Sequence, residues 1–249
     1  MRFRVLGPVQ VRTGAGWATV RALQQRQLLA VLLARAGGAV TVERLAAELW
    51  GERRPPTAVA TIRVYVMHLR RMLGDGPART LVTRDRGYQM AVGDADLDSL
   101  VFDRLCREGQ RSLAGGEPVA AVASLSRALA LWQGAAMGDA LVPGTPIVAA
   151  EAARLEQRRL GALERYFDAQ LHLGQHAGVV EDLAEAVARH PLRERLREQL
   201  MLALSRCGRR AEALEAYRLG RALLVADLGL EPGPGLRGLH LAILGGHGQ

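Results

Sequence analysis

Apolar residues recur three and four positions apart over most of this chain, which is the periodicity of amphipathic helices. The pattern is clearest in residues 57–73, TAVATIRVYVMHLRRML, which predict a helix with one buried stripe. The stripe consists of Ile62, Tyr65, Val66, Leu69 and Leu73. Pro55 and Pro56 cannot continue a preceding helix, and the Thr57 hydroxyl after them can cap the new one. We therefore expect this helix to start at residue 57.

The segments around this helix predict shorter elements. Alternating apolar residues near the N-terminus, at 3–11 and 18–20, predict short antiparallel strands around a glycine-rich turn. Residues 23–36 and 41–50 have helical stripes, and the Thr41 hydroxyl can cap the second of these helices at Arg44. Two β-prone runs at 80–84 and 88–92, joined by the turn 85–87, predict a hairpin. Strands, three helices and a hairpin in this order indicate a winged helix-turn-helix over residues 1–92.

The remainder, residues 93–249, lacks strand-like alternation and predicts an all-helical domain. Helical stripes occur at 100–113, 118–132, 149–173, 179–188, 192–205 and 211–227. Gly116, Gly174 and Gly208 each precede the second helix of a pair, and the last two are 34 residues apart. That period is typical of tetratricopeptide repeats. Residues 134–147 fall within an insertion of the array.

Charge divides the chain at the same place. Residues 1–92 contain 15 arginines and 5 acids, a net charge of +10, whereas residues 93–249 contain 18 arginines and 20 acids, a net charge of −2. The helix at 57–73 has no acid. Since the chain has no lysine and no asparagine, a codon bias accounts for some of the arginine. The uneven distribution of charge between the two parts of the chain is better evidence than the arginine content, and it predicts a polyanionic partner for the first domain.

A winged helix reads DNA with a helix in the major groove and a cationic hairpin beside it. We predict base-edge or groove-wall contacts for Thr57, Thr61, Arg63 and His68. We predict phosphate contacts for Tyr65, Arg70 and Arg71, and wing contacts for Arg84 and Arg86. Taken alone, each arginine is about as well explained as a solvated surface cation, and Tyr65 also falls on the buried stripe.

Catalytic and metal chemistry find no support in the residues. A phosphate-binding loop needs a lysine, which the chain lacks, and no nucleophile with a base and an orienting group is evident. His172 and His176 are four apart but have no third ligand, and Cys106 and Cys207 are far apart. We expect no enzyme activity, catalytic residues, metal or cofactor. The cysteine usage and the lack of a signal peptide or membrane span predict a cytoplasmic, nucleoid-associated protein.

Short segments in both domains resemble one bacterial family. In the first domain they are RQLLAVLL (26–33), LWG (49–51), VYV (64–66), LRR (69–71) and RDRGY (84–88). In the second they are ALW (130–132), HPLRERL (190–196), GRRAEAL (208–214) and LGLEPGP (228–234). The first domain resembles response-regulator winged helices and the second the bacterial transcriptional activation domain. Together they resemble a Streptomyces antibiotic regulatory protein of the small, two-domain type.

The resemblance implies a pathway-specific transcriptional activator of a secondary-metabolite, or antibiotic, gene cluster. It further implies a homodimer that binds direct repeats of double-stranded DNA near the −35 element and recruits RNA polymerase. In that family the corner between the second and third helices faces the sigma factor, which implies this role for Glu52, Arg53 and Arg54. Met67-His68 departs from the small polar residue and arginine expected there. A different operator sequence follows from that departure.

Two alternatives stay open on the residues alone. DNA binding does not fix the sign of regulation, so a repressor with the same binding mode is the nearer alternative. A protein-interaction scaffold built on the tetratricopeptide-like array is the other, and the concentrated positive charge of residues 1–92 argues against it. No phosphoacceptor domain precedes the winged helix, so we expect control through protein abundance or a partner.

Overall fold

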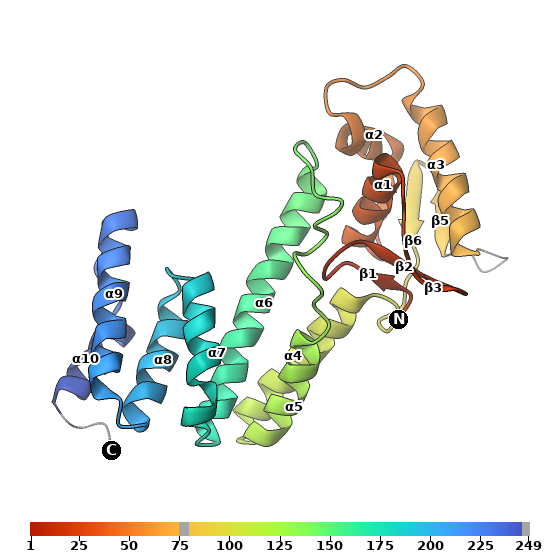
Figure 1. Ribbon diagram of the computed structural model, residues 1–249. Coiled ribbons are helices and arrows are strands. Elements are labelled where there is room, and N and C mark those ends of the chain that lie inside the picture. Colours follow the sequence, from red (N-terminus) through yellow and green to blue (C-terminus); the bar gives the residue numbers. More distant parts are fainter. Residues whose placement is uncertain (75–79, 246–249) are drawn as a thin grey trace. The chain divides into compact units, whose positions relative to one another are not determined.

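The computed structural model describes residues 1–74 and 80–245 (Figure 1). By contacts the chain divides into two units. Unit 1 comprises Met1–Arg107 and Arg127–Leu160, and unit 2 comprises Glu108–Ser126 and Gly161–Gln249. Unit 1 thus extends beyond the winged-helix segment, and a domain boundary near residue 92 stays a prediction. Within the described residues, no helix has the length and apolar character needed to cross a membrane.

Unit 1 begins with a three-stranded antiparallel sheet, as the alternating apolar residues predicted. Its strands are β1 (Phe3–Arg4), β2 (Gln10–Thr13) and β3 (Gly16–Thr19), in the order β1-β2-β3. Phe3, Val5, Val9 and Val11 are almost fully buried, so the alternation marks the side of the sheet that joins the core.

Three helices follow, close to their predicted positions. They are α1 (Leu23–Ala34), α2 (Val42–Trp50) and α3 (Ala58–Leu73). The Arg44 amide donates to the Thr41 hydroxyl at 3.2 Å, which confirms the predicted cap. The predicted cap at Thr57 is wrong, because its hydroxyl makes no capping hydrogen bond and its backbone lies near φ −86°, ψ 6° rather than in the extended region.

A second sheet holds the hairpin against the helices. It consists of β4 (Ala39–Thr41), β5 (Leu81–Arg84) and β6 (Gly87–Met90), in the order β4-β6-β5. The hairpin β5–β6 confirms the prediction, whereas β4 was not predicted. Thr41 pairs with Gly87, and Val40 pairs with Tyr88, so the strand that leads into α2 also anchors the hairpin.

The segment between the helices α5 (Pro118–Leu129) and α6 (Pro146–His172) packs against the loop between β1 and β2 within unit 1. The Gln133 and Met137 amides both donate at 2.8 Å, to the Leu6 and Val5 carbonyls respectively. Met137 is buried and has a φ of 52°, which is uncommon for a residue other than glycine. This segment contains most of the predicted insertion at residues 134–147, and it serves to complete the core of unit 1.

Buried carboxylates accept backbone hydrogen bonds between distant parts of unit 1. Asp98, at the start of α4 (Asp98–Ala114), accepts from the Val5 amide at 2.9 and 3.0 Å and from the Leu6 amide at 3.1 Å. Burial raises the pKa of the Asp98 carboxyl to about 6, against the opposing effect of these hydrogen bonds. Glu48 of α2 is also buried and accepts from the Ile147 amide at 3.0 and 3.2 Å. Both carboxylates therefore join the winged-helix segment to the later part of unit 1.

Aspartate 139 makes a third connection of this kind. Asp139 accepts from the Val9 amide at 2.7 Å and forms an ion pair with the α1 residue Arg26 at 3.3 Å. The Arg26 guanidinium also donates to the Asp139 and Val20 carbonyls. One arginine therefore holds the segment after α5 and the loop before α1 together.

Unit 2 is helical, as predicted. Its elements include α7 (His176–Arg189), α8 (Glu194–Arg206), α9 (Arg210–Leu228) and α10 (Pro234–Leu244), and α8 contacts the other three. Sequence patterns did not predict α10. The buried Arg197 of α8 donates to the Ala216 and Pro191 carbonyls at 2.9 and 3.0 Å, and burial lowers the pKa of its guanidinium.

The predicted junction glycines share one backbone conformation. Gly116, Gly174 and Gly208 follow α4, α6 and α8, with φ values of 73°, 73° and 76°. In this left-handed region a Cβ atom would be strained, so glycine ends each first helix and allows the chain to reverse. The repeated junction agrees with the tetratricopeptide-like pattern of helix pairs.

Candidate nucleic-acid interface

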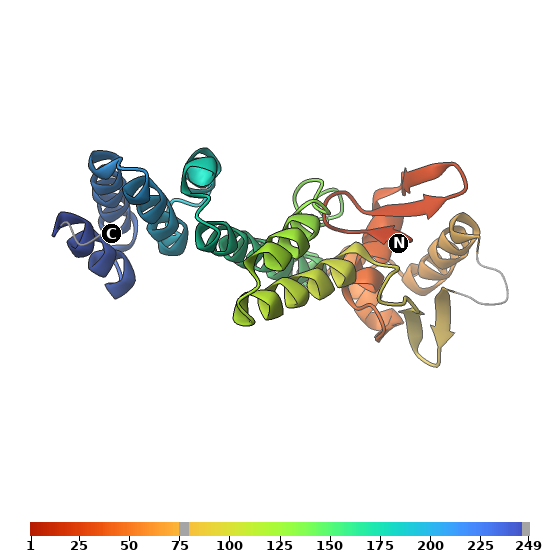
Figure 2. The same cartoon turned by 90° about the horizontal axis from the view of Figure 1, so that it is seen from below.

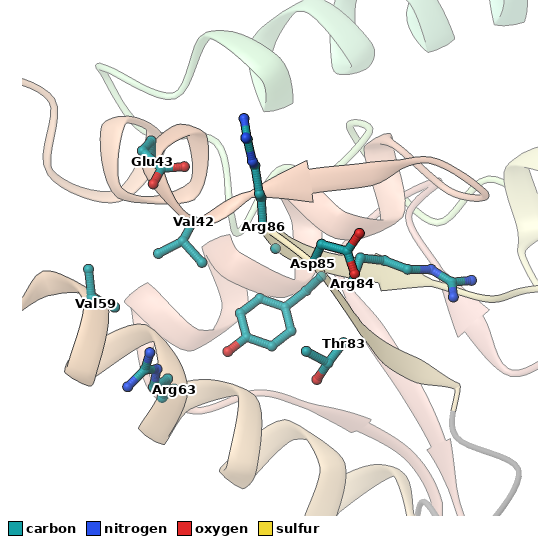
Figure 3. A pocket seen from close by; sticks show the side chains of 10 residues that line it. Val42, Glu43, Val59, Arg63, Thr83, Arg84, Asp85 and Arg86 are labelled. Atoms are coloured by element: carbon teal, nitrogen blue, oxygen red, sulfur yellow. The ribbon is translucent and has the colours of Figure 1, made fainter.

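A groove of about 520 Å³ lies between α3, the start of α2 and the tip of the β5–β6 hairpin, which we call the wing (Figure 3). Its lining residues are Val42, Glu43, Val59, Arg63, Thr83, Arg84, Asp85, Arg86, Gly87 and Tyr88. Arg63 comes from α3, and Arg84 and Arg86 come from the wing. The structure therefore brings three of the predicted DNA-contacting arginines to one groove.

Backbone contacts fix the wing relative to α2. The Val42 amide at the start of α2 donates to the Arg86 carbonyl at 2.9 Å. Gly87 approaches β4 so closely that a Cβ atom on it would lie 1.9 Å from the Val40 carbonyl oxygen. Only glycine leaves room for this approach, and the wing tip is thereby placed beside the helix that precedes α3.

Side chains fix the wing relative to α3. The Arg70 guanidinium donates to the Leu81 carbonyl at 3.0 Å and to the Thr83 hydroxyl at 2.8 Å, and it lies 6.0 Å from the centre of the Tyr88 ring. Arg70 thus binds the first strand of the wing. Phosphate contact by Arg70 stays a prediction, and the structure gives this side chain a second role in holding helix and wing together.

Arg84 is oriented by a chain of hydrogen bonds along the wing. Its Nε donates to the Gln89 Oε1 at 2.6 Å, and the Gln89 Nε2 donates to the Gly37 carbonyl at 2.5 Å. The terminal nitrogens of Arg84 have no hydrogen-bond partner among the described residues. Figure 3 shows the Arg84 and Arg86 side chains pointing in different directions from the wing tip.

Other predicted cations are exposed. Arg63, Arg71 and Arg86 have no ion-pair or hydrogen-bond partner within the part of the chain that the structure describes. Glu43 and Asp85 also line the groove, so its three cations are partly offset. The remaining positive charge, with unpaired guanidinium groups, is suited to an anion such as a phosphate backbone.

The opposite edge of α3 faces the start of α1. The Tyr65 hydroxyl donates to the Gln24 Oε1 at 2.5 Å, and the His68 Nδ1 lies 3.1 Å from the Gln25 Nε2. The Thr61 hydroxyl donates to the Thr57 carbonyl at 3.0 Å within the helix. None of these four predicted residues lines the wing groove. Tyr65 is half-buried, so it is neither a fully buried core residue nor a fully exposed candidate for phosphate contact.

Figure 2 shows α3 between the N-terminal sheet and the wing in unit 1. The buried side of α3 consists of Ala58, Ile62, Val66, Leu69 and Leu73, which leaves the opposite side exposed. The corner residues Glu52, Arg53 and Arg54 before α3 are exposed as well. The sequence did not identify Gln24 and Gln25 as neighbours of α3, because contacts between separate helices leave no local pattern.

Comparisons with known proteins place this fold among transcriptional regulators. Residues 22–90 match the family "Transcriptional regulatory protein, C terminal", and residues 97–244 match the "Bacterial transcriptional activator domain". The fold and the groove therefore belong to a bacterial transcription factor with a winged-helix segment and an all-helical activator segment.

Individual relatives narrow the class. Regulatory protein DnrI of Streptomyces peucetius is 39% identical over 252 residues, which cover 98% of this chain and 92% of DnrI. Regulatory protein AfsR of Streptomyces griseus is 41% identical over 244 residues, but the chain spans only 24% of AfsR. The chain belongs to the Streptomyces antibiotic regulatory protein family of transcriptional activators, which confirms the resemblance seen in the sequence.

A solved structure agrees with the fold. Mycobacterium tuberculosis EmbR, determined in complex with a low-affinity phosphopeptide, superposes with a TM-score of 0.93 at 31% sequence identity. The match covers 98% of this chain and 65% of the EmbR chain. A winged-helix region followed by an all-helical domain is therefore the correct fold class.

Proposed function

We propose that this protein activates a secondary-metabolite gene cluster by binding direct repeats near the −35 element as a head-to-tail homodimer and recruiting RNA polymerase. The observation that supports DNA binding most directly is the groove that Arg63 of α3 lines together with Arg84 and Arg86 of the wing. A helix that fits the major groove and a cationic hairpin beside it form a reader of double-stranded DNA.

We assign each predicted residue a role in DNA binding according to the edge of α3 or the wing on which it lies. Arg63, Arg84 and Arg86 contact the DNA backbone or base edges from the wing side, and Arg71 extends from the outward side. Thr57, Thr61 and His68 contact the major groove of the DNA from the edge of α3 nearer α1. Tyr65 lies between the DNA and Gln24. Arg70 holds the wing in place while its remaining charge attracts phosphate.

The corner before α3 is proposed as the polymerase contact. Glu52, Arg53 and Arg54 are exposed on a loop that does not belong to the wing groove. An exposed charged loop next to the reading helix is well placed to bind a protein on adjacent DNA, and we assign it to the sigma factor. The same proposal makes the protein a cytoplasmic, nucleoid-associated regulator without catalytic activity.

Genome-wide binding of the tagged full chain, followed by footprinting at the strongest site, tests the DNA-binding part. We expect tandem repeats spaced by about one helical turn and abutting a −35 element. Scattered sites without a repeat would contradict the head-to-tail homodimer and favour an interaction scaffold.

In vitro transcription from a footprinted promoter tests the direction of regulation. Added protein should increase the output of RNA polymerase in proportion to promoter occupancy. A decrease in transcript at full occupancy would replace the activator with a repressor. A promoter whose repeats are scrambled serves as the control, because its transcription should not respond to the protein.

A further inference from the structure

The outward side of α3 has an apolar centre. Ala60, Val64, Met67 and Arg71 recur four, three and four residues apart and are all exposed, so they form one row along the helix. The Val64 and Met67 side chains keep 44% and 49% of their surface exposed. They lie opposite the buried stripe of α3, where a helix that enters the major groove faces the base edges.

Polar groups flank this centre but do not occupy it. Arg63 faces the wing groove on one edge, and His68 contacts Gln25 on the other. Val64 and Met67 can neither donate nor accept a conventional hydrogen bond to a base. Valine is also a poorer helix former than alanine, so helix stability alone does not account for an exposed valine here.

The major groove presents one apolar feature, the C5-methyl group of thymine. Adenine, guanine and cytosine present hydrogen-bonding groups in the groove, and an apolar side chain packed over these removes water without replacing its hydrogen bonds. We propose that Val64 and Met67 pack against thymine C5-methyl groups and thereby select A·T pairs beneath the middle of α3. This inference rests on the proposed function, because it assumes that α3 enters the major groove.

The spacing of the two side chains defines where the thymines lie. Three residues of α-helix advance about 4.5 Å along the helix axis. Base pairs of B-DNA are stacked about 3.4 Å apart. Val64 and Met67 therefore contact neighbouring base pairs in each half-site, and the arginines and threonines at the edges of α3 fix the register of the helix.

Replacing single thymines by deoxyuridine tests this inference, because uracil differs from thymine only by the missing methyl group. A preferred binding site is first selected from random double-stranded DNA with the full chain. Each thymine of one half-site is then replaced in turn, and Kd is measured by fluorescence anisotropy. We expect a loss of roughly fourfold at one or two neighbouring positions and no change elsewhere, from the burial of one methyl group.

Substitutions in the protein assign the contact to a side chain. In Met67→Ala and Val64→Ala, the deoxyuridine effect should disappear at the position that each side chain contacts, as a double-mutant cycle requires. Arg206→Ala, an exposed arginine of unit 2, is the control and should retain the full effect. Circular dichroism confirms that the variants are folded.

Two failures are distinguishable. If the protein binds a selected sequence tightly but no deoxyuridine position weakens binding, thymine recognition by Val64 and Met67 is wrong while the proposed function stands. The same holds if the deoxyuridine effect persists in both alanine variants. If the selected DNA binds no better than unrelated DNA, sequence-specific binding itself is refuted.

Discussion

Asp98→Asn tests how unit 1 is held together. The Asp98 side chain is 1% exposed and accepts the Val5 and Leu6 amides, so an asparagine there keeps one acceptor oxygen and places an NH₂ group against an amide donor. We expect the substitution to destabilise unit 1 by about 1–3 kcal/mol at every pH, the cost of an unsatisfied buried donor. The pH dependence of that loss is the sharper prediction.

The pKa of Asp98 fixes the sign of the pH dependence. Its value is about 6 in the folded protein, compared with an ordinary value of 3.8. Because the folded state takes up a proton more readily than the unfolded state, the stability contribution of the carboxyl is largest below pH 3.8 and is lost as the pH rises through 6. Below both pKa values, this difference in pKa adds about 3 kcal/mol to the free energy of unfolding. At pH 5 the contribution is about 1.4 kcal/mol larger than at pH 7.5.

Urea unfolding monitored by tryptophan fluorescence measures this effect, because Trp17, Trp50 and Trp132 are the only tryptophans and all belong to unit 1. The stability difference between the unaltered chain and Asp98→Asn should be about 1.4 kcal/mol larger at pH 5 than at pH 7.5. Asp94→Asn removes an exposed carboxylate nearby and should reproduce the unaltered pH profile. A stability difference that is constant with pH, or that grows toward pH 7.5, would refute the reasoning.

Three further variants test the wing and the corner. Gly87→Ala would place a Cβ atom 1.9 Å from the Val40 carbonyl oxygen, so we expect a loss of about 2 kcal/mol or more in urea unfolding and weaker DNA binding; unchanged stability would contradict the close packing. Arg84→Ala should weaken binding to most sequences and reduce the slope of log K against log salt by about 1, whereas Arg206→Ala should not; equal slopes would remove Arg84 from the phosphate contacts. Joint replacement of Arg53 and Arg54 by alanine should preserve Kd for DNA while lowering transcription in vitro, and a collapse of DNA affinity would place the corner on DNA instead.

Local sequence patterns predicted the helices and the wing of the first 92 residues because each has its own periodicity, cap or turn. Thr41 capped its helix as expected, since its backbone is extended. Thr57 did not, because the chain after Pro55 and Pro56 enters α3 through a turn that orients the hydroxyl differently. The three-residue strand β4 was missed because it exists through pairing with β6, a partner more than 40 residues away in the chain.

The sequence allowed candidate DNA-contacting residues to be chosen by their charge and their position on a helix or hairpin, but it did not show their contacts. The sequence placed Arg63, Arg84 and Arg86 among the readers, and the structure brings them to one groove. It could not show that Arg70 holds the wing, or that Tyr65 and His68 contact glutamines of α1, because those contacts join separate elements. Likewise, no local pattern marked Asp98 as the acceptor for the Val5 and Leu6 amides, because these lie more than 90 residues before it in the chain.

The discontinuous composition of unit 1 has a consequence for synthesis of the protein on the ribosome. Unit 1 needs residues up to Leu160, although its reading helix and wing are complete by residue 90. A nascent chain that has emerged only this far still lacks the partners of Leu6, Val9 and Glu48. Contacts between such distant residues form late. We therefore expect unit 1 to complete its fold only after residue 160 has left the ribosome, and the segment around β1–β3 to lack its later partners until then.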